Sequence, residues 1–254
     1  SFQFNVGLTG LIMISFSYLH NGKEVKSAIA IALGTLIKLY GIVGLAFFFF
    51  SKNKLKLILS GLIALIALVI LPAILSSPEF IVRSYTDWFI SLKEKNMQNV
   101  SLNSMQDISF MGMVRRIMQD ASIPNLPFLI GGLSLFFLPY ARISQYQYKT
   151  YRLMLLASVL IFTVIFSSGS ESPTYIIAFA GVSIWFMIQE FPGSKGILFL
   201  FVFAFLLTSM SPSDLFPKII RDTYIKPYSL KALPCVLIWF VIIYQMLTIN
   251  NKKL

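Results

Sequence analysis

Residues 55–75 read LKLILSGLIALIALVILPAIL, an apolar run in which Lys56 carries the only charge. A helix needs about 20 mostly apolar residues to span the hydrocarbon core of a bilayer. We therefore interpret this run as a transmembrane helix. Seven further apolar runs indicate that most of the chain lies in a membrane. Their approximate ranges are 5–20, 28–50, 124–140, 153–168, 173–189, 196–210 and 232–249.

The composition of the chain agrees with this interpretation. Of its 254 residues, 57 % are hydrophobic and 12 % are charged, whereas about 25 % of a soluble domain is charged. These values exclude a disordered chain, a disulfide scaffold and a soluble globular domain. The chain has one cysteine, Cys235, and one histidine, His20. We therefore expect no internal disulfide, no Cys/His metal site and no cofactor.

The apolar runs predict an all-α fold, a polytopic transmembrane bundle of about seven to eight membrane segments that forms a single domain over residues 1–254. The longest connection, 76–123, is polar but contains Tyr85 and Trp88 in an apolar stretch. This pattern is typical of a helix at the membrane interface. We expect the acidic residues of the long connections to be solvated. They are Asp87, Asp107, Asp214 and Asp222.

The formal charge of +11 is interpreted as an orientation signal, because cytoplasmic loops are rich in Lys and Arg. We expect membrane lipids, and no nucleic acid, as partners of this charge. The basic turns 23–26, 52–56 and 142–152 should all be cytoplasmic. Residues 1–5, 76–123, 167–173 and 211–231 should then lie outside.

The basic turns 23–26 and 52–56 flank the run 28–50. If both are cytoplasmic, this run cannot cross the membrane once. This run contains Lys38 between Gly34 and Gly41. A lysine at the bilayer centre costs about 2.5–3.5 kcal/mol on insertion scales. The sequence therefore favours a re-entrant pair of half-helices with Lys38 near the tip. The alternative is an ordinary span that directs Lys38 inward.

Lys38 is the clearest functional candidate, because an ionisable residue inside a membrane usually serves a function. We expect it to bind an anionic group such as a phosphate. The alternative is a lysine that reaches an interface or pairs with a carboxylate of another helix. Gln3 and Asn5, at the outer end of the first run, could bind a sugar or a pyrophosphate through their amides.

Two further groups lie in the external connections. Adjacent Arg115 and Arg116 suit bidentate phosphate binding, although they could instead touch lipid headgroups. Glu171, with Ser172 beside it, could act as a general base or bind a hydroxyl group, or could be a solvated turn residue. The same ambiguity between phosphate and lipid binding applies to the other external cations. They are Arg83, Lys218, Arg221, Lys226 and Lys231.

Four stretches, in this order and spacing, resemble glycosyltransferase family 87, the polyprenol-phosphate-mannose-dependent branch of the type C membrane glycosyltransferases. Together they span most of the chain. They are Ser1-Phe-Gln3-Phe-Asn5, Ala32-Leu-Gly-Thr-Leu-Ile-Lys38-Leu-Tyr40-Gly41, Ser77-Pro-Glu-Phe followed by Tyr85-Thr-Asp-Trp88, and Ser170-Glu-Ser-Pro-Thr-Tyr-Ile-Ile-Ala178 running into Trp185.

The resemblance implies a multi-span enzyme of the bacterial inner membrane, active at the outer face. It would move a mannose-like hexose, with inversion, from a polyprenyl-phosphate donor to a glycan or lipid acceptor. Lys38, Arg115 and Arg116 would bind the donor phosphate. The sugar and acceptor would contact a polar set. Its members are Gln3, Asn5, Tyr40, Glu171 and Ser172.

The sequence departs from the family pattern at two places. Gly41 stands where many members have Pro, and Glu171-Ser-Pro-Thr-Tyr stands where many have a Trp and His pair. The resemblance also implies a catalytic aspartate in a loop before Ser1, which would make this chain the C-terminal portion of a longer protein. Glu171 is the alternative base within the chain.

Three other functions remain open at this point. A transporter or flippase of a lipid-linked or anionic substrate would also use a broken helix with a buried cation, but it should show inverted repeats, and none is visible. An O-antigen polymerase-like enzyme would also have long external loops. A membrane scaffold would have no use for a buried Lys38.

Overall fold

The computed structural model describes residues 3–99, 102, 106–190 and 194–249, and every regular element in these ranges is helical. The predicted all-α class is therefore confirmed. The chain divides into two units, Ser1–Met97 and Gln98–Leu254, and each is described here by itself.

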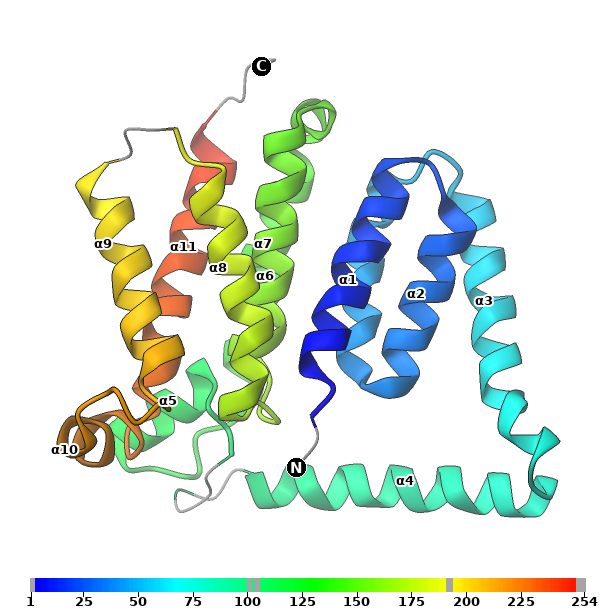
Figure 1. Ribbon diagram of the computed structural model, residues 1–254, viewed down its shortest axis with the longest axis horizontal. Coiled ribbons are helices and arrows are strands. Elements are labelled where there is room, and N and C mark those ends of the chain that lie inside the picture. Colours follow the sequence, from blue (N-terminus) through cyan, green and yellow to red (C-terminus); the bar gives the residue numbers. More distant parts are fainter. Residues whose placement is uncertain (1–2, 100–101, 103–105, 191–193, 250–254) are drawn as a thin grey trace. The chain divides into compact units, whose positions relative to one another are not determined.

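The first unit is an up-and-down arrangement of helices (Figure 1). Helices α1, α2 and α3 and the 3-10 helix η1 run alternately up and down and pack against one another. A short 3-10 helix, η2, leads from α3 into α4, which runs across the bundle axis. The bounds are α1 Asn5–His20, α2 Glu24–Ile37, η1 Leu39–Phe50, α3 Lys54–Ile70, η2 Leu71–Ile74 and α4 Pro78–Asn99.

The run 28–50 is a helical hairpin rather than one straight helix. Helix α2 ends at Ile37, Lys38 is extended with φ −155° and ψ 131°, and η1 runs back along α2. The two helices touch at Gly34 and Gly41, where a Cβ on Gly41 would overlap the backbone of Gly34. Lys38 thus lies at the tip of a hairpin, as the re-entrant interpretation expects. Its insertion into a membrane stays a prediction.

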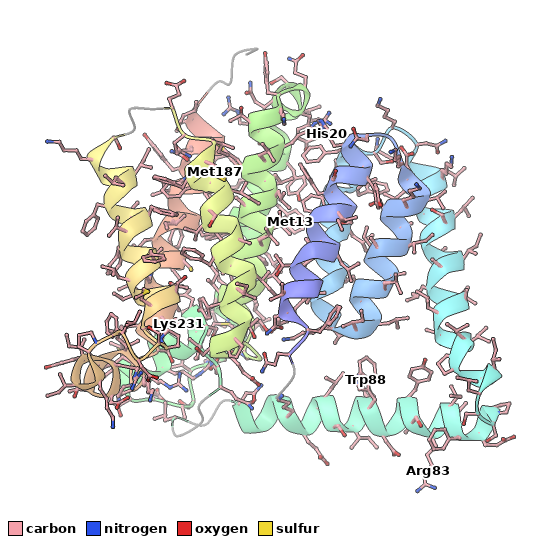
Figure 2. All side chains as sticks on the ribbon, in the orientation of Figure 1. Met13, His20, Arg83, Trp88, Met187 and Lys231 are labelled. Carbon is pink, nitrogen blue, oxygen red and sulfur yellow. The ribbon has the colours of Figure 1, made fainter. Side chains whose placement is uncertain are left out.

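Helix α4 lies in the connection where an interfacial helix is expected. Trp88 and Arg83 lie on opposite sides of it, with Trp88 on the side of the bundle (Figure 2). The hydroxyl of Tyr85 donates to the carbonyl of Val69 at 3.0 Å, which ties α4 to α3. An aromatic side and a charged side suit the membrane interface.

The second unit has α7, α8 and α11 at its centre. The indole of Trp239 on α11 donates to Ser158 on α7 at 3.0 Å, and that of Trp185 on α8 donates to Gln245 on α11 at 2.9 Å. The bounds are α5 Phe110–Met118, α6 Asn125–Phe137, η3 Leu138–Ala141, η4 Ile143–Gln147, α7 Lys149–Ile165, η5 Ser172–Thr174, α8 Tyr175–Met187, α9 Lys195–Ala204, η6 Phe205–Met210, α10 Lys218–Ile220, η7 Arg221–Ile225, η8 Leu230–Ala232 and α11 Leu233–Thr248.

The polar connections of this unit gather at one of its ends. Figure 1 shows α5 and α10 together at the end where α7 turns into α8. Ser170 and Tyr175 both donate through their hydroxyls to the carbonyl of Ile108, at 2.6 and 2.7 Å. Two connections expected on one side of the membrane, around 108 and 170, therefore meet.

Two stretches in the described ranges are long and apolar enough to span a membrane, Lys54–Ile74 and Leu230–Thr248. The first covers residues 55–74 of the run 55–75, on which the membrane interpretation began. Four shorter apolar stretches accompany them: Leu39–Phe50, Asn125–Ala141, Ser172–Met187 and Lys195–Met210. The predicted total of seven to eight segments and the single transmembrane domain stay predictions.

Candidate functional site

The tip of the α2–η1 hairpin holds the first polar cluster. The ammonium group of Lys38 donates to the Asn5 side-chain oxygen at 3.0 Å, and the Asn5 amide nitrogen donates to Gln3 at 2.6 Å. The same ammonium nitrogen lies 4.7 Å from the ring centroid of Tyr40. The structure therefore brings together four of the predicted site residues, Gln3, Asn5, Lys38 and Tyr40.

Local structure explains how this cluster is positioned. Asn5 is the first residue of α1 and is only 3 % exposed, and its carbonyl accepts a hydrogen bond from Thr9 at 2.8 Å. The close contact of Gly34 and Gly41 lets the hairpin turn tightly at Lys38. A cation next to two amides and a phenol ring can bind a phosphate and the hydroxyl groups of a sugar.

A second cluster surrounds Asp107 in the other unit. Arg115 forms an ion pair with Asp107, and the two side chains are 1 % and 3 % exposed. The expectation that Asp107 is solvated is therefore wrong, because its charge is neutralised inside the protein. Arg115 also donates to Asn125 at 2.7 Å and to the carbonyl of Ile123 at 3.0 Å.

Arg116 bonds α5 to two other segments, one at residues 106–107 and one at Ser229. Its guanidinium group donates to the Ser229 hydroxyl and, at 2.8 and 3.2 Å, to the carbonyls of Gln106 and Asp107. Burial lowers the pKa of this guanidinium, but an arginine remains charged in proteins. Arg115 and Arg116 thus hold loops together. A donor phosphate would have to share or displace these bonds.

Lys231 forms the third polar feature, at the same end of the second unit (Figure 2). It is 6 % exposed, and its ammonium group donates to the Ser172 hydroxyl at 2.8 Å and to the Ser172 carbonyl at 3.0 Å. The ammonium nitrogen lies 5.3 Å from the ring centroid of Tyr175. Among the residues that the structure describes, no carboxylate forms an ion pair with Lys231.

Glu171 begins the turn that carries Ser172. Its carbonyl accepts a hydrogen bond from the Thr174 amide at 2.9 Å, and its own amide donates to the Thr174 hydroxyl at 3.3 Å. The predicted Glu171 and Ser172 therefore lie in the segment that Lys231 contacts. The same segment is bonded to Ile108 through Ser170. In the described ranges, no three His, Cys, Asp or Glu side chains are grouped to hold a metal ion.

The sequence interpretation singled out Lys38 but treated Lys231 as one of several external cations. One signal was present: Lys231 immediately precedes the last apolar run, 232–249. Its partner Ser172 lies 59 residues away. That contact depends on how three connections fold together, which residue spacing does not encode.

Comparison with known protein families gives a match to the model of Glycosyltransferase family 87 over residues 2–168. The matched range contains the Lys38 cluster and both arginines of α5. It ends shortly before Glu171 and well before Lys231. Among curated proteins and solved structures, the comparisons found no match to this chain.

Proposed function

The chain belongs to glycosyltransferase family 87, which makes it a membrane glycosyltransferase, and on this premise we propose the reaction that it catalyses. The donor is a mannose-like hexose on a polyprenyl phosphate. The acceptor is a glycan or a lipid. Transfer takes place at the outer face of the bacterial inner membrane, with the chain crossing that membrane several times.

The observation that carries this proposal is the Lys38 cluster at the tip of the α2–η1 hairpin, whose other charged residues, Glu24 and Lys26, lie at the opposite end of α2. Lys38 contacts Asn5 at 3.0 Å, and Asn5 contacts Gln3 at 2.6 Å. A phosphate leaving group gains negative charge as the sugar departs, and a fixed cation stabilises that charge. The amides next to Lys38 supply hydrogen bonds for sugar hydroxyls.

An apolar groove next to this cluster supports a lipid-linked donor. The groove has a volume of about 270 Å³ and lies between α2, η1 and α3. Its lining includes Thr35 and Ile42, which are three and four residues from Lys38. A polyprenyl chain in this groove would bring its phosphate towards the ammonium group of Lys38.

The proposed chemistry is a single displacement. The acceptor hydroxyl attacks the anomeric carbon, the bond from that carbon to the phosphate oxygen breaks, and the phosphate keeps the electron pair. A carboxylate takes the acceptor proton. The family resemblance implies that this carboxylate is an aspartate. Glu171 is the alternative candidate for the base. Inversion at the anomeric carbon follows from attack on the side opposite to the leaving group.

The proposal is tested with the protein in liposomes and a radiolabelled hexose. We expect transfer of the label from polyprenyl phosphate to an added glycan or lipid acceptor, and none from the corresponding nucleotide sugar. Transfer from the nucleotide sugar alone would contradict the donor assignment. Movement of the labelled lipid across the bilayer without transfer would indicate a flippase instead.

A further inference from the structure

Two turns of the first unit lie side by side at the end of the bundle opposite to Lys38 (Figure 1). The first joins α1 to α2, and the second joins η1 to α3. The carboxylate of Glu24, at the start of α2, accepts hydrogen bonds from the backbone amide of Asn53 at 3.2 Å and from the hydroxyl of Ser51 at 3.4 Å. Glu24 therefore holds the two turns together, so that residues distant in the sequence form one surface.

Four exposed lysines share this surface, which we call the lysine surface. They are Lys23, Lys26, Lys54 and Lys56. Lys52 lies beside them, with its side chain over Gly22. Glu24 is the only acidic residue in the sequence before Glu79, and it is buried. In the described ranges, no carboxylate forms an ion pair with any of these five lysines, so their positive charge is open to a ligand.

The backbone of the lysine surface adds to this positive charge. Both α2 and α3 begin here, at Glu24 and Lys54. The N-terminus of a helix carries a partial positive charge of about half an elementary charge. The side chain of Asn53 caps α3 by accepting a hydrogen bond from the backbone amide of Lys56 at 2.9 Å. The lysines of the second turn are therefore attached to a capped helix start.

Apolar side chains alternate with the lysines. Val25 precedes Lys26 and is 40 % exposed, and Leu55 precedes Lys56 and is 66 % exposed. The stretch Lys54–Ile74 continues beyond Leu55 as a candidate membrane span, and most of its side chains are exposed. A lysine can lay its methylene stem along apolar surface while its ammonium group stays at the polar boundary. This arrangement fits the boundary between lipid headgroups and acyl chains better than an acidic protein or a nucleic acid.

We propose that the lysine surface binds the phosphate groups of anionic phospholipids, the class to which phosphatidylglycerol belongs. Lys23 and Lys26 contact the headgroups from one turn, and Lys54 and Lys56 contact them from the other. The exposed apolar side chains between these lysines enter the layer beneath the headgroups. Because Lys38 lies at the other end of α2, this lipid and the sugar donor have separate sites. The inference therefore does not depend on the reaction proposed above.

Lipid binding by the full chain in detergent tests this proposal, with the bound lipids counted by native mass spectrometry. The unaltered chain should retain phosphatidylglycerol in preference to phosphatidylcholine, whose headgroup has no net charge. A lysine near an anionic membrane surface strengthens binding roughly fivefold, so neutralising the lysine surface should weaken phosphatidylglycerol binding at least about tenfold. Phosphatidylcholine binding should stay unchanged. The fourfold variant for this test carries Lys23→Gln, Lys26→Gln, Lys54→Gln and Lys56→Gln.

A second fourfold variant is the matched control, because it loses the same charge at exposed lysines of other segments. It carries Lys93→Gln, Lys195→Gln, Lys218→Gln and Lys226→Gln. The control should keep the preference for phosphatidylglycerol. Arginine at the four positions of the lysine surface preserves the charge and should preserve the preference as well.

Three results would overturn the proposal. They are an unchanged preference for phosphatidylglycerol in the folded Gln variant of the lysine surface, an equal loss in the control, and a loss in the folded Arg variant. The first result is also the one expected if the surface binds an acidic protein or a nucleic acid instead.

Thermal unfolding shows whether each variant folds. If the fourfold Gln variant does not fold, two double variants test the surface in its place. They are Lys23→Gln with Lys26→Gln and Lys54→Gln with Lys56→Gln. Each should weaken phosphatidylglycerol binding about fivefold or more, and unchanged binding in both would overturn the proposal.

Hexose transfer by the unaltered chain separates this inference from the proposed function. If the chain prefers phosphatidylglycerol but transfers no hexose, the proposed function fails alone. If it transfers hexose but binds both phospholipids equally, the inference fails alone.

Discussion

The ammonium group of Lys38 and the side-chain oxygen of Asn5 lie 3.0 Å apart, although 33 residues separate them in the sequence. The contact joins the tip of the α2–η1 hairpin to the first turn of α1. Asn5 is uncharged, so the positive charge of Lys38 is not cancelled by it. We therefore expect the charge at this position to control donor binding.

Replacing Asn5 by Asp tests this expectation with almost no change in shape. The new carboxylate would pair with Lys38 and compete with a phosphate. We expect the KM for the polyprenyl-phosphate donor to rise about tenfold, while thermal stability is kept or increased. Asn21→Asp, at the exposed C-terminal end of α1, is the control. An unchanged KM in Asn5→Asp would contradict a phosphate at Lys38.

The buried ion pair of Asp107 and Arg115 predicts a large effect on stability. Arg115→Met leaves the Asp107 carboxylate buried without a partner, which should destabilise the protein by about 3–5 kcal/mol. Arg83→Met breaks an exposed pair with Asp87, whose side chains are 83 % and 67 % exposed, and should cost about 0–1 kcal/mol. Denaturant unfolding of both variants measures the difference. A similar loss of unfolding free energy in Arg115→Met and Arg83→Met would contradict a stability effect of burying the Asp107 pair.

The hairpin contact predicts that Gly41 tolerates no side chain. A Cβ there would overlap the backbone of Gly34, so Gly41→Ala should destabilise the protein by about 1–3 kcal/mol. Gly10→Ala is the control, because nothing lies within 4 Å of a Cβ at Gly10. It should be neutral or stabilise α1 by up to about 1 kcal/mol. A stable Gly41→Ala variant would mean that α2 and η1 pack less closely.

Glu24 predicts a pH dependence at the opposite end of the first unit. Hydrogen bonds from its own backbone amide, from Asn53 at 3.2 Å and from Ser51 at 3.4 Å hold the pKa of this carboxyl below its usual range. A lowered pKa stabilises the fold above the unfolded-state pKa of about 4.3. This contribution is lost as the pH falls through the folded-state pKa.

Thermal midpoints measured from neutral to acidic pH check this expectation. Glu24→Gln should lower the midpoint at neutral pH and flatten the decline below about pH 4.3. Glu79→Gln, on exposed α4, is the control and should leave the profile unchanged. Identical profiles for the Glu24→Gln variant and the unaltered chain would contradict a role for these hydrogen bonds in stability.

Hydrophobic patterning predicted the helical class and most helix positions. The run 124–140 corresponds to α6 and η3, Asn125–Ala141, because a long apolar segment favours a helix in a membrane. The position of Lys38 between glycines also indicated the break in the run 28–50. The structure places Gln3 and Asn5, predicted to contact the sugar or acceptor, beside Lys38, predicted to contact the phosphate. The roles of these three residues stay predictions.

The contacts of the second unit could not be predicted in the same way. Asp107, which pairs with Arg115, has a left-handed backbone with φ 54°, and Ser229, which bonds to Arg116, has one with φ 52°. Such turns depend on tertiary contacts. In these connections a buried side chain can be followed directly by an exposed one, so the sequence shows no regular pattern of burial. Polarity alone therefore suggested a solvated Asp107 and left Lys231 undistinguished.

The central claim is that Lys38 contacts the phosphate of a lipid-linked sugar donor. Its most direct test is transfer of labelled hexose from polyprenyl phosphate by Lys38→Met in liposomes. Lys52→Met, an exposed lysine in the connection between η1 and α3, is the matched control. We predict that Lys38→Met folds and loses transfer, while Lys52→Met keeps it. Full transfer by folded Lys38→Met would contradict the account.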